Sequence, residues 1–339
     1  MELNQLKCFE VVARTENISQ AAQELYIKIA ALDRIDVPAY IVASFTTRIH
    51  GIGTFRGWRN IYSKEKWLRV HCTQEWPDLH CTYNENDLLK FFDHYMKGVD
   101  NGWENTPRVR LSVINPGGQD IMERPEEDFP LKRQRLTTYH LNAAGMTLDP
   151  ERVETESQVS YCGHDGKSHV SFKMTFKERT EIVGYVGVKL WVESFGYNDM
   201  DLFIKMLKVD DNGDPVYHYP VPGQNMFPFS GPFIRQRVSL RKLDPMRSTP
   251  NEPYHTFDEV QKLRPYEVVP VEVCLTPTGM VFEAGEHLVL DVAGFPYDMD
   301  EDMPTLMKMG IDNNGPHIIH TGGQYDSQLI LPVIPEKEV

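Results

Sequence analysis

Residues 184–216, which read GYVGVKLWVESFGYNDMDLFIKMLKVDDNGDPV, carry the pattern that decides the fold. Apolar side chains occupy every second position at Val186, Val188, Leu190 and Val192. This period of two is typical of a half-buried strand, and residues 202–209 repeat it. Residues 211–213 (DNG) then supply a tight-turn signal, because Gly213 can adopt a positive φ. The stretch predicts two strands and a turn.

Similar short runs recur from about Pro107 to the end of the chain. We expect further strands at residues 136–141, 170–176, 234–241, 267–275, 287–292 and 328–333. Prolines and glycines separate these runs, and no helical pattern lies between them. Many short strands without intervening helices predict an all-β sandwich or jelly roll over residues 107–335.

Residues 33–105 show a different pattern, with α/β character. Residues 37–44 (VPAYIVAS) form a nearly continuous apolar run, as expected for a buried parallel strand, and residues 67–71 (WLRVH) make a second strand. A helix is indicated by apolar residues at helical spacing, namely Leu88, Phe91, Phe92 and Tyr95. Asn84 can cap its start and Gly98 its end. Two strands and one helix cannot enclose a core, so we expect them to complete a larger sheet.

Residues 1–27 predict a short helical piece. Leu6, Phe9, Val12 and Ala13 recur at helical spacing, and Ser19 can cap a second helix. The segment resembles the start of LysR-type transcriptional regulators, whose third helix enters the major groove. Residues 28–36 (KIAALDRID) do not continue into such a helix, so no base-reading surface is expected. A DNA-binding regulator is therefore the weakest functional alternative.

The composition narrows the function further. The 339 residues include 49 acidic and 35 basic side chains, for a net charge of -14, which argues against nucleic acid and anionic membranes as partners. No apolar stretch approaches the roughly 20 residues of a membrane-spanning helix, and residues 1–6 do not resemble a signal peptide, so we expect a cytoplasmic protein.

The cysteines and histidines predict neither a disulfide framework nor a metal site. An odd number of cysteines without a signal peptide indicates reduced thiols: Cys8, Cys72, Cys81, Cys162 and Cys274. Residues 71–72 and 80–81 repeat a His-Cys pair, but adjacent side chains on a strand point to opposite faces, so each pair could offer only one ligand. We expect no metal and no cofactor. His317 and His320, three residues apart, are expected to be structural.

Several short motifs occur in the order found in one hydrolase family. They are residues 37–39 (VPA), 91–93 (FFD), 97–98 (KG), 107–110 (PRVR), 184–186 (GYV), 199–203 (DMDLF) and 282–287 (FEAGEH). Over residues 33–335 the chain resembles the C-terminal part of the Xaa-Pro dipeptidyl-peptidase and cocaine-esterase family. The resemblance implies a truncated α/β-hydrolase segment at residues 33–105, followed by a jelly-roll sandwich of the galactose-binding-like type at residues 107–335. The expected fold class is therefore mixed.

The resemblance also implies a Ser-Asp-His triad, which this sequence does not display. No Gly-x-Ser-x-Gly string occurs, and the nearest, residues 166–168 (GKS), lacks the second glycine. Thr47 stands at or near the family's aspartate position and Glu75 at its histidine position. A threonine cannot orient an imidazole as a carboxylate does, and a glutamate titrates too low to replace histidine as a base. We therefore expect the chain to be inactive by itself.

Other assignments stay open at this stage. His50 as a base with Glu75 or Asp78 as its partner would form a rearranged acid–base set in a full-length relative. A jelly-roll module that binds a ligand, for example a carbohydrate, is the alternative function. The apolar strand at residues 37–44 should have an open edge, which predicts a homo-oligomer or a companion chain that supplies the missing hydrolase half.

Overall fold

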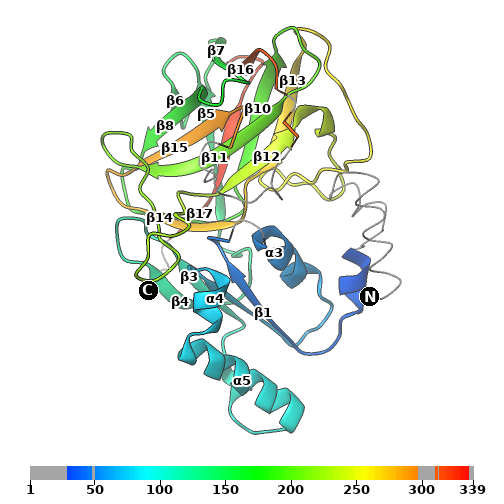
Figure 1. The fold of residues 1–339 in the computed structure, drawn as a ribbon, viewed down its shortest axis with the longest axis vertical. Helices are drawn as coiled ribbons and strands as arrows, with labels where there is room; N and C mark the ends of the chain where they lie inside the picture. The colour runs from blue at the N-terminus through cyan, green and yellow to red at the C-terminus, as the bar shows by residue number, and fades with distance from the viewer. Residues whose placement is uncertain (1–28, 48–49, 297–309, 312, 336–339) are drawn as a thin grey trace.

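The computed structural model describes residues 29–47, 50–296, 310–311 and 313–335. The helices predicted within residues 1–27 lie outside these ranges. The described chain is mostly β, with a small mixed sheet, a large and almost wholly antiparallel sheet, and few helices (Figure 1). Within it, no helix has both the length and the apolar character needed to cross a membrane.

The small sheet has the strand order β1-β2-β3-β4. Strand β1 (Ala39–Ser44) pairs in parallel with β2 (Lys66–His71), and β2 pairs in parallel with β3 (Val109–Val113). Strand β4 (Ile121–Glu126) is antiparallel to β3. The strands predicted at residues 37–44 and 67–71 are thereby confirmed, and they are parallel as their apolar pattern indicates.

Helices cover both faces of the small sheet. Phe55 and Trp58 of α3 (Gly51–Asn60) join a buried cluster with Leu68 of β2. On the other face Trp67 packs on Phe91 of α5 (Thr82–Lys97), with ring centroids 6.3 Å apart. Neighbouring residues of β2 thus serve opposite faces, as the alternation of side chains along a strand requires. The remaining short helices are η1 (Ile29–Arg34), α4 (Glu75–Leu79), η2 (Trp103–Asn105) and η3 (Val238–Leu240).

The ends of α5 test two capping predictions. Gly98 is left-handed, with a φ of 67°, and its N–H bonds back to the last turn, so this prediction is confirmed. The prediction that Asn84 caps the start was wrong, because α5 begins earlier, at Thr82. The Asn84 amide instead donates to the backbone and side-chain oxygens of Asp78 at 2.9 and 3.0 Å.

The small sheet extends past residue 107, where the sequence predicts the start of the sandwich. Strand β3 pairs with β2 from Val109 to Leu111, and β4 extends the sheet to Glu126. The predicted division at residues 105–107 therefore does not coincide with the change of sheet. The reason is that β3 and the β4 hairpin carry the same short apolar pattern as the strands that follow them, so periodicity alone cannot assign them to a sheet.

The large sheet has 13 strands, in the order β12-β11-β15-β8-β6-β5-β17-β10-β16-β7, with β13 on β10 and β9 joining β14 to β17. Its strands are β5 (Arg135–Asn142), β6 (Thr147–Asp149), β7 (Ser157–Cys162), β8 (His169–Thr175), β9 (Thr180–Gly184), β10 (Gly187–Ser194), β11 (Asp201–Val209), β12 (Phe233–Arg237), β13 (Val268–Cys274), β14 (Thr278–Phe282), β15 (His287–Ala293), β16 (Pro316–Thr321) and β17 (Gln328–Ile334). Every strand predicted from residue 136 onwards is present. The one predicted at 234–241 ends at Arg237, where η3 follows.

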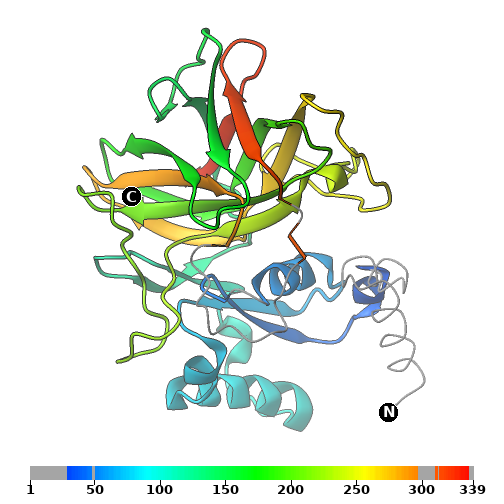
Figure 2. The same cartoon turned by 45° about the horizontal axis from the view of Figure 1, so that its top comes forward.

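The two sheets meet where β3 ends, and they pack closely there (Figure 2). The Ile114 N–H donates to Gly279 O at 2.9 Å, and the Val281 N–H donates to Ile114 O at 2.9 Å. A side chain at Gly279 would stand 2.5 Å from the Phe45 ring, so a glycine is required at this contact. The buried Lys208 of β11 also links the two sheets, because its Nζ donates a hydrogen bond to Asn115 Oδ1 at 3.0 Å.

Candidate functional site

The carboxyl ends of the parallel strands β1 and β2 are where an α/β sheet places ligands and reacting groups. Three hydroxyl-bearing residues meet there. Ser44 Oγ donates to Thr73 O at 2.8 Å, Thr46 Oγ1 donates to the same carbonyl at 3.2 Å, and the two hydroxyls lie 3.0 Å apart. These hydroxyls are occupied in tying the two strand ends together.

The residues that sequence analysis assigned to the family's triad positions lie near these strand ends but do not form a set. Thr47 is buried, and within the described part of the chain its Oγ1 has no hydrogen-bond partner. His50 is exposed and directly precedes α3, and Glu75 is exposed at the first residue of α4. Among the described residues, no hydrogen bond or ion pair joins His50 to Glu75 or Asp78.

Asp78, the third candidate, is committed to a buried ion pair. Its Oδ1 accepts from Arg69 Nη1 at 2.9 Å, and its Oδ2 accepts from Arg69 Nη2 at 2.5 Å. The two side chains are only 8% and 5% exposed. With the Asn84 amide on Oδ1 as well, the carboxylate has little capacity left for a substrate.

His71 is a residue that sequence analysis overlooked as a base. It is the last residue of β2, and its Nδ1 lies 3.0 Å from Thr73 Oγ1 and 3.5 Å from Asp78 Oδ1. Burial lowers the pKa of His71 to about 4, so the ring is neutral at pH 7. Its position at the end of a predicted strand, with an acid seven residues later, was the available signal. The ring nitrogen Nδ1 also accepts from the Thr73 N–H at 3.3 Å, so the contacts of His71 with Thr73 hold the strand end in place.

The Arg69–Asp78 pair belongs to a larger buried network around Tyr40. The Tyr40 hydroxyl accepts from Arg69 Nε at 3.0 Å and from Arg110 Nη2 at 2.7 Å, and it donates to the Asp87 carboxylate. Arg110 also binds both carboxylate oxygens of Asp87, at 3.1 and 2.7 Å. Burial raises the pKa of Tyr40, so it remains a protonated donor. The network fastens α4 and α5 to strands β1, β2 and β3.

A serine in the loop between β7 and β8 also fails to provide a nucleophile. Ser168, of the string at residues 166–168, lines a surface hollow of about 490 Å³ beside Cys162 and His169. Its Oγ donates to the Asp165 carboxylate, which is a hydrogen bond inside the loop. The Asp165 carboxylate cannot replace the histidine that activates a catalytic serine.

A second group of titratable side chains lies just beyond β2, between the two sheets. It consists of Cys72, Asp120 and His218, whose ligand atoms all lie within 4.8 Å of one another. His218 belongs to the loop of residues 210–232 that crosses from the large sheet. No sequence motif connects these residues. Among the described residues, no group of potential metal ligands combines the His-Cys pair at residues 71–72 with the pair at residues 80–81.

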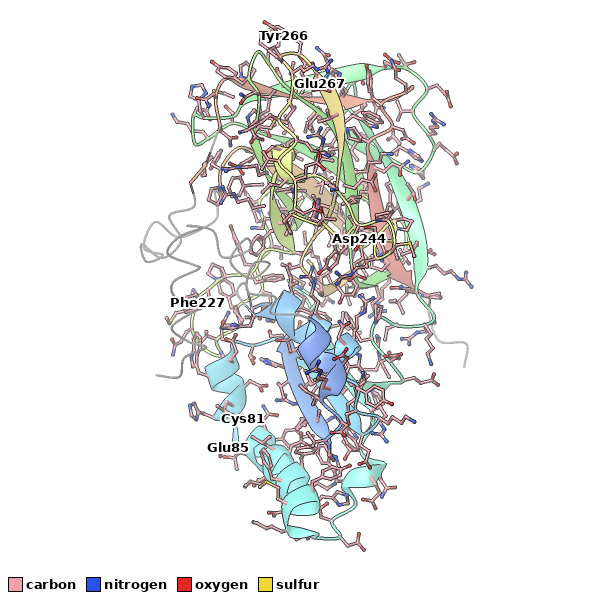
Figure 3. The ribbon with its side chains drawn as sticks, turned by 90° about the vertical axis from the view of Figure 1, so that its right-hand side faces the viewer. Cys81, Glu85, Phe227, Asp244, Tyr266 and Glu267 are labelled. Carbon is pink, nitrogen blue, oxygen red and sulfur yellow. The ribbon has the colours of Figure 1, made fainter. Side chains whose placement is uncertain are left out.

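The same loop contacts the start of α4. The Gln74 N–H donates to Pro220 O at 2.9 Å, and the Trp76 ring meets the Phe227 ring edge-on, with centroids 5.6 Å apart. Figure 3 shows Phe227 beside this helix, with Cys81 and Glu85 at the start of α5. The segment that follows β2 is thus in contact with the loop of residues 210–232.

Comparison with known proteins gives matches for most of the chain. Residues 101–330 match the model of the X-Pro dipeptidyl-peptidase C-terminal non-catalytic domain. The structure of a CocE/NonD family hydrolase from Staphylococcus aureus is similar with a TM-score of 0.83 and 35% identity, over 89% of this chain and 55% of that one. No curated protein sequence matches the chain.

Two more distant solved structures share the fold alone. An aminopeptidase from a marine sediment archaeon, Thaumarchaeota archaeon, has a TM-score of 0.66 and 13% identity, over 92% of this chain and 58% of that one. An α-amino acid ester hydrolase has a TM-score of 0.65 and 14% identity, over 98% of this chain and 61% of that one. The chain thus spans 55–61% of the length of these three solved structures.

Proposed function

The chain belongs to the family of the X-Pro dipeptidyl-peptidase C-terminal non-catalytic domain, and from this we propose that it is the non-catalytic part of a CocE/NonD-type hydrolase. In this proposal the small sheet is the final portion of an α/β-hydrolase sheet and the large sheet is a jelly-roll sandwich. The complete hydrolase cleaves acyl esters or peptides, and this chain by itself does not.

One observation supports the inactive assignment above the others. At the strand ends where the family's acid and base belong, the chain has a buried threonine, Thr47, and an exposed glutamate, Glu75. The nearby histidine–carboxylate pair, His71 and Asp78, is buried, faces Thr73 and is tied to Arg69. Acyl transfer needs a nucleophile within hydrogen-bond reach of its base, and this pair has none of the required kind.

The proposal predicts that the folded chain does not react with a fluorophosphonate probe and does not hydrolyse short-chain esters above the buffer rate. Labelling is measured by mass spectrometry on folded and heat-denatured samples, with a known serine esterase as the positive control. The heat-denatured sample controls for labelling of serines that does not depend on the folded structure. Labelling of one serine, found in the folded chain and absent after denaturation, would reveal a nucleophile and overturn the proposed inactivity.

We further propose that β1 is the edge that receives the rest of the hydrolase or a second copy of the chain. Within the described residues β1 pairs only with β2, so one row of its backbone groups is available. Val42 of this strand is 36% exposed. An unprotected, apolar edge strand favours pairing with another strand.

This edge predicts self-association of the isolated chain at micromolar concentration. We expect light scattering after size exclusion to show species larger than one chain, and Val42→Lys to shift the distribution towards monomer, because a lysine on an edge strand opposes pairing. Val260→Lys is the matched control, since Val260 is 62% exposed in a loop. A monodisperse monomer for the unmodified chain would count against an open edge.

A further inference from the structure

Three potential metal ligands come together from distant parts of the sequence. Cys72 directly follows β2, Asp120 directly precedes β4, and His218 lies in the loop of residues 210–232. We propose that these three side chains bind a zinc-type divalent metal ion. The proposal is independent of the hydrolase role, because none of the three belongs to the triad positions.

The separations suit such an ion. Cys72 Sγ lies 3.6 Å from Asp120 Oδ2, and His218 Nδ1 lies 3.6 Å from the same oxygen. Tetrahedral zinc, with bonds of about 2.0 Å to nitrogen or oxygen and 2.3 Å to sulfur, places its ligand atoms about 3.3–3.6 Å apart. The third separation, from the Cys72 sulfur to the His218 nitrogen, is at most 4.8 Å. Bringing it to the tetrahedral distance needs a movement of at most about 1.3 Å.

Outer contacts orient two of the ligands. His218 Nε2 donates to Cys72 O at 2.6 Å, so this nitrogen carries the proton and Nδ1 is left to coordinate. Asp120 Oδ1 accepts from the Asn115 N–H at 2.7 Å, which directs Oδ2 towards the other two ligands. Metal-binding histidines and carboxylates characteristically have such second partners, which fix the tautomer and the direction of the ligand atom.

The three side chains also suit a divalent cation electrostatically. His218 Nδ1 and the Asp120 carboxylate face each other, with the Cys72 sulfur beside them. Binding of Zn²⁺ would deprotonate the thiol, and one thiolate with one carboxylate balances the charge of the ion.

The site is accessible from solvent. The side chains of His218 and Asp120 are 12% and 23% exposed, so the cluster borders solvent. Met122, which is 61% exposed, places its Sδ 3.8 Å from Cys72 Sγ. Three protein ligands leave one tetrahedral position for water. An ion here would link the end of β2 and the approach to β4 to a loop of the large sheet.

The test uses the full chain, stripped of metal with a chelator and titrated with Co²⁺ and then Zn²⁺. We expect one equivalent of Co²⁺ to produce tetrahedral visible bands and a thiolate charge-transfer band in the near ultraviolet, and Zn²⁺ to displace both. The charge-transfer band should be absent in Cys72→Ser and present in Cys81→Ser, the matched control on the exposed thiol. The same two variants distinguish this site from adventitious binding at surface thiols.

Affinity for Zn²⁺, measured by competition with a chromophoric chelator, provides a readout that does not depend on Cys72. His218→Gln and Asp120→Asn should each weaken binding by roughly a hundredfold or more, since even outer-sphere changes cost about 10- to 100-fold. Circular dichroism would establish that these variants are folded. The proposal is overturned if the parent chain gives no charge-transfer band, if the band survives in Cys72→Ser, or if His218→Gln binds as tightly as the parent.

Discussion

Asp78→Asn is expected to lower the free energy of unfolding by about 3 kcal/mol, the lower end of the 3–5 kcal/mol typical of breaking a buried ion pair. The Arg69 guanidinium, 5% exposed, would lose the carboxylate that binds it bidentately. The next carboxylate, Glu123, lies 3.8 Å away. Asparagine keeps an oxygen for one guanidinium N–H, which places the effect at the lower end of the range.

Denaturant unfolding followed by circular dichroism measures this effect, and two further variants interpret it. Glu259→Gln removes a carboxylate from an exposed pair with Lys242 and should leave the unfolding midpoint unchanged. The double change Arg69→Met with Asp78→Leu should cost less than the sum of the two single changes, because it removes both buried charges together. If Asp78→Asn unfolds at the midpoint of the parent, Asp78 is not a structural anchor and its candidacy as a site residue reopens.

The fold was predictable from sequence where one period dominates. Residues 186–192 alternate and, from Gly187 onwards, lie in β10, while the mostly apolar residues 202–209 lie in β11, which is buried along its whole length. The cap of α5 was mispredicted because Asn84 had a stronger tertiary partner in Asp78 than in its own helix. Local patterns also could not assign β3 to the small sheet, since that choice depends on pairing with residues about 40 positions earlier.

The candidate sites were much less predictable, because their members are far apart in sequence. Cys72 and Asp120 are separated by 48 positions, and Cys72 and His218 by 146. No spacing rule connects such residues. Asp78 became a site candidate because it lies three residues after Glu75 in the sequence. In the structure it instead forms an ion pair with Arg69 of β2, nine positions earlier. Burial and partner choice, which determine the role of an ionisable side chain, are properties of the folded chain.

His317 shows how burial decides the chemistry of a histidine that the sequence indicated only as structural. It lies on β16, is fully buried, and its Nδ1 is 3.1 Å from the hydroxyl of Tyr161 on the neighbouring strand β7. Its Nε2 has no hydrogen-bond partner within the described chain, and it stands 2.3 Å from where a side chain on Gly163 would begin. Little room exists for water to solvate a charged ring at this position.

Acidification should therefore destabilise the chain through His317. Burial lowers the pKa of His317 from its ordinary 6.5 to about 4. Since the unfolded chain binds this proton first, the contribution to stability is complete above pH 6.5, falls between pH 6.5 and 4, and amounts to about 3 kcal/mol. His71 and His255, whose pKa values burial also lowers to about 4, act in the same direction.

In His317→Gln, unfolding should take up one proton fewer between pH 6.5 and 4. Because His317 is one of three histidines whose pKa burial lowers to about 4, the fall in the free energy of unfolding over this range should be smaller by about one third. The measurement is a series of denaturant unfolding curves across this range, for the parent, His317→Gln and the exposed control His80→Gln. The control should keep the parent's slope. The glutamine variant is compared by slope rather than by absolute stability, because a packing loss at this buried site lowers the whole curve without changing its shape. Equal slopes in His317→Gln and the parent would show that His317 takes up its proton in the folded chain, and the argument from burial would fail.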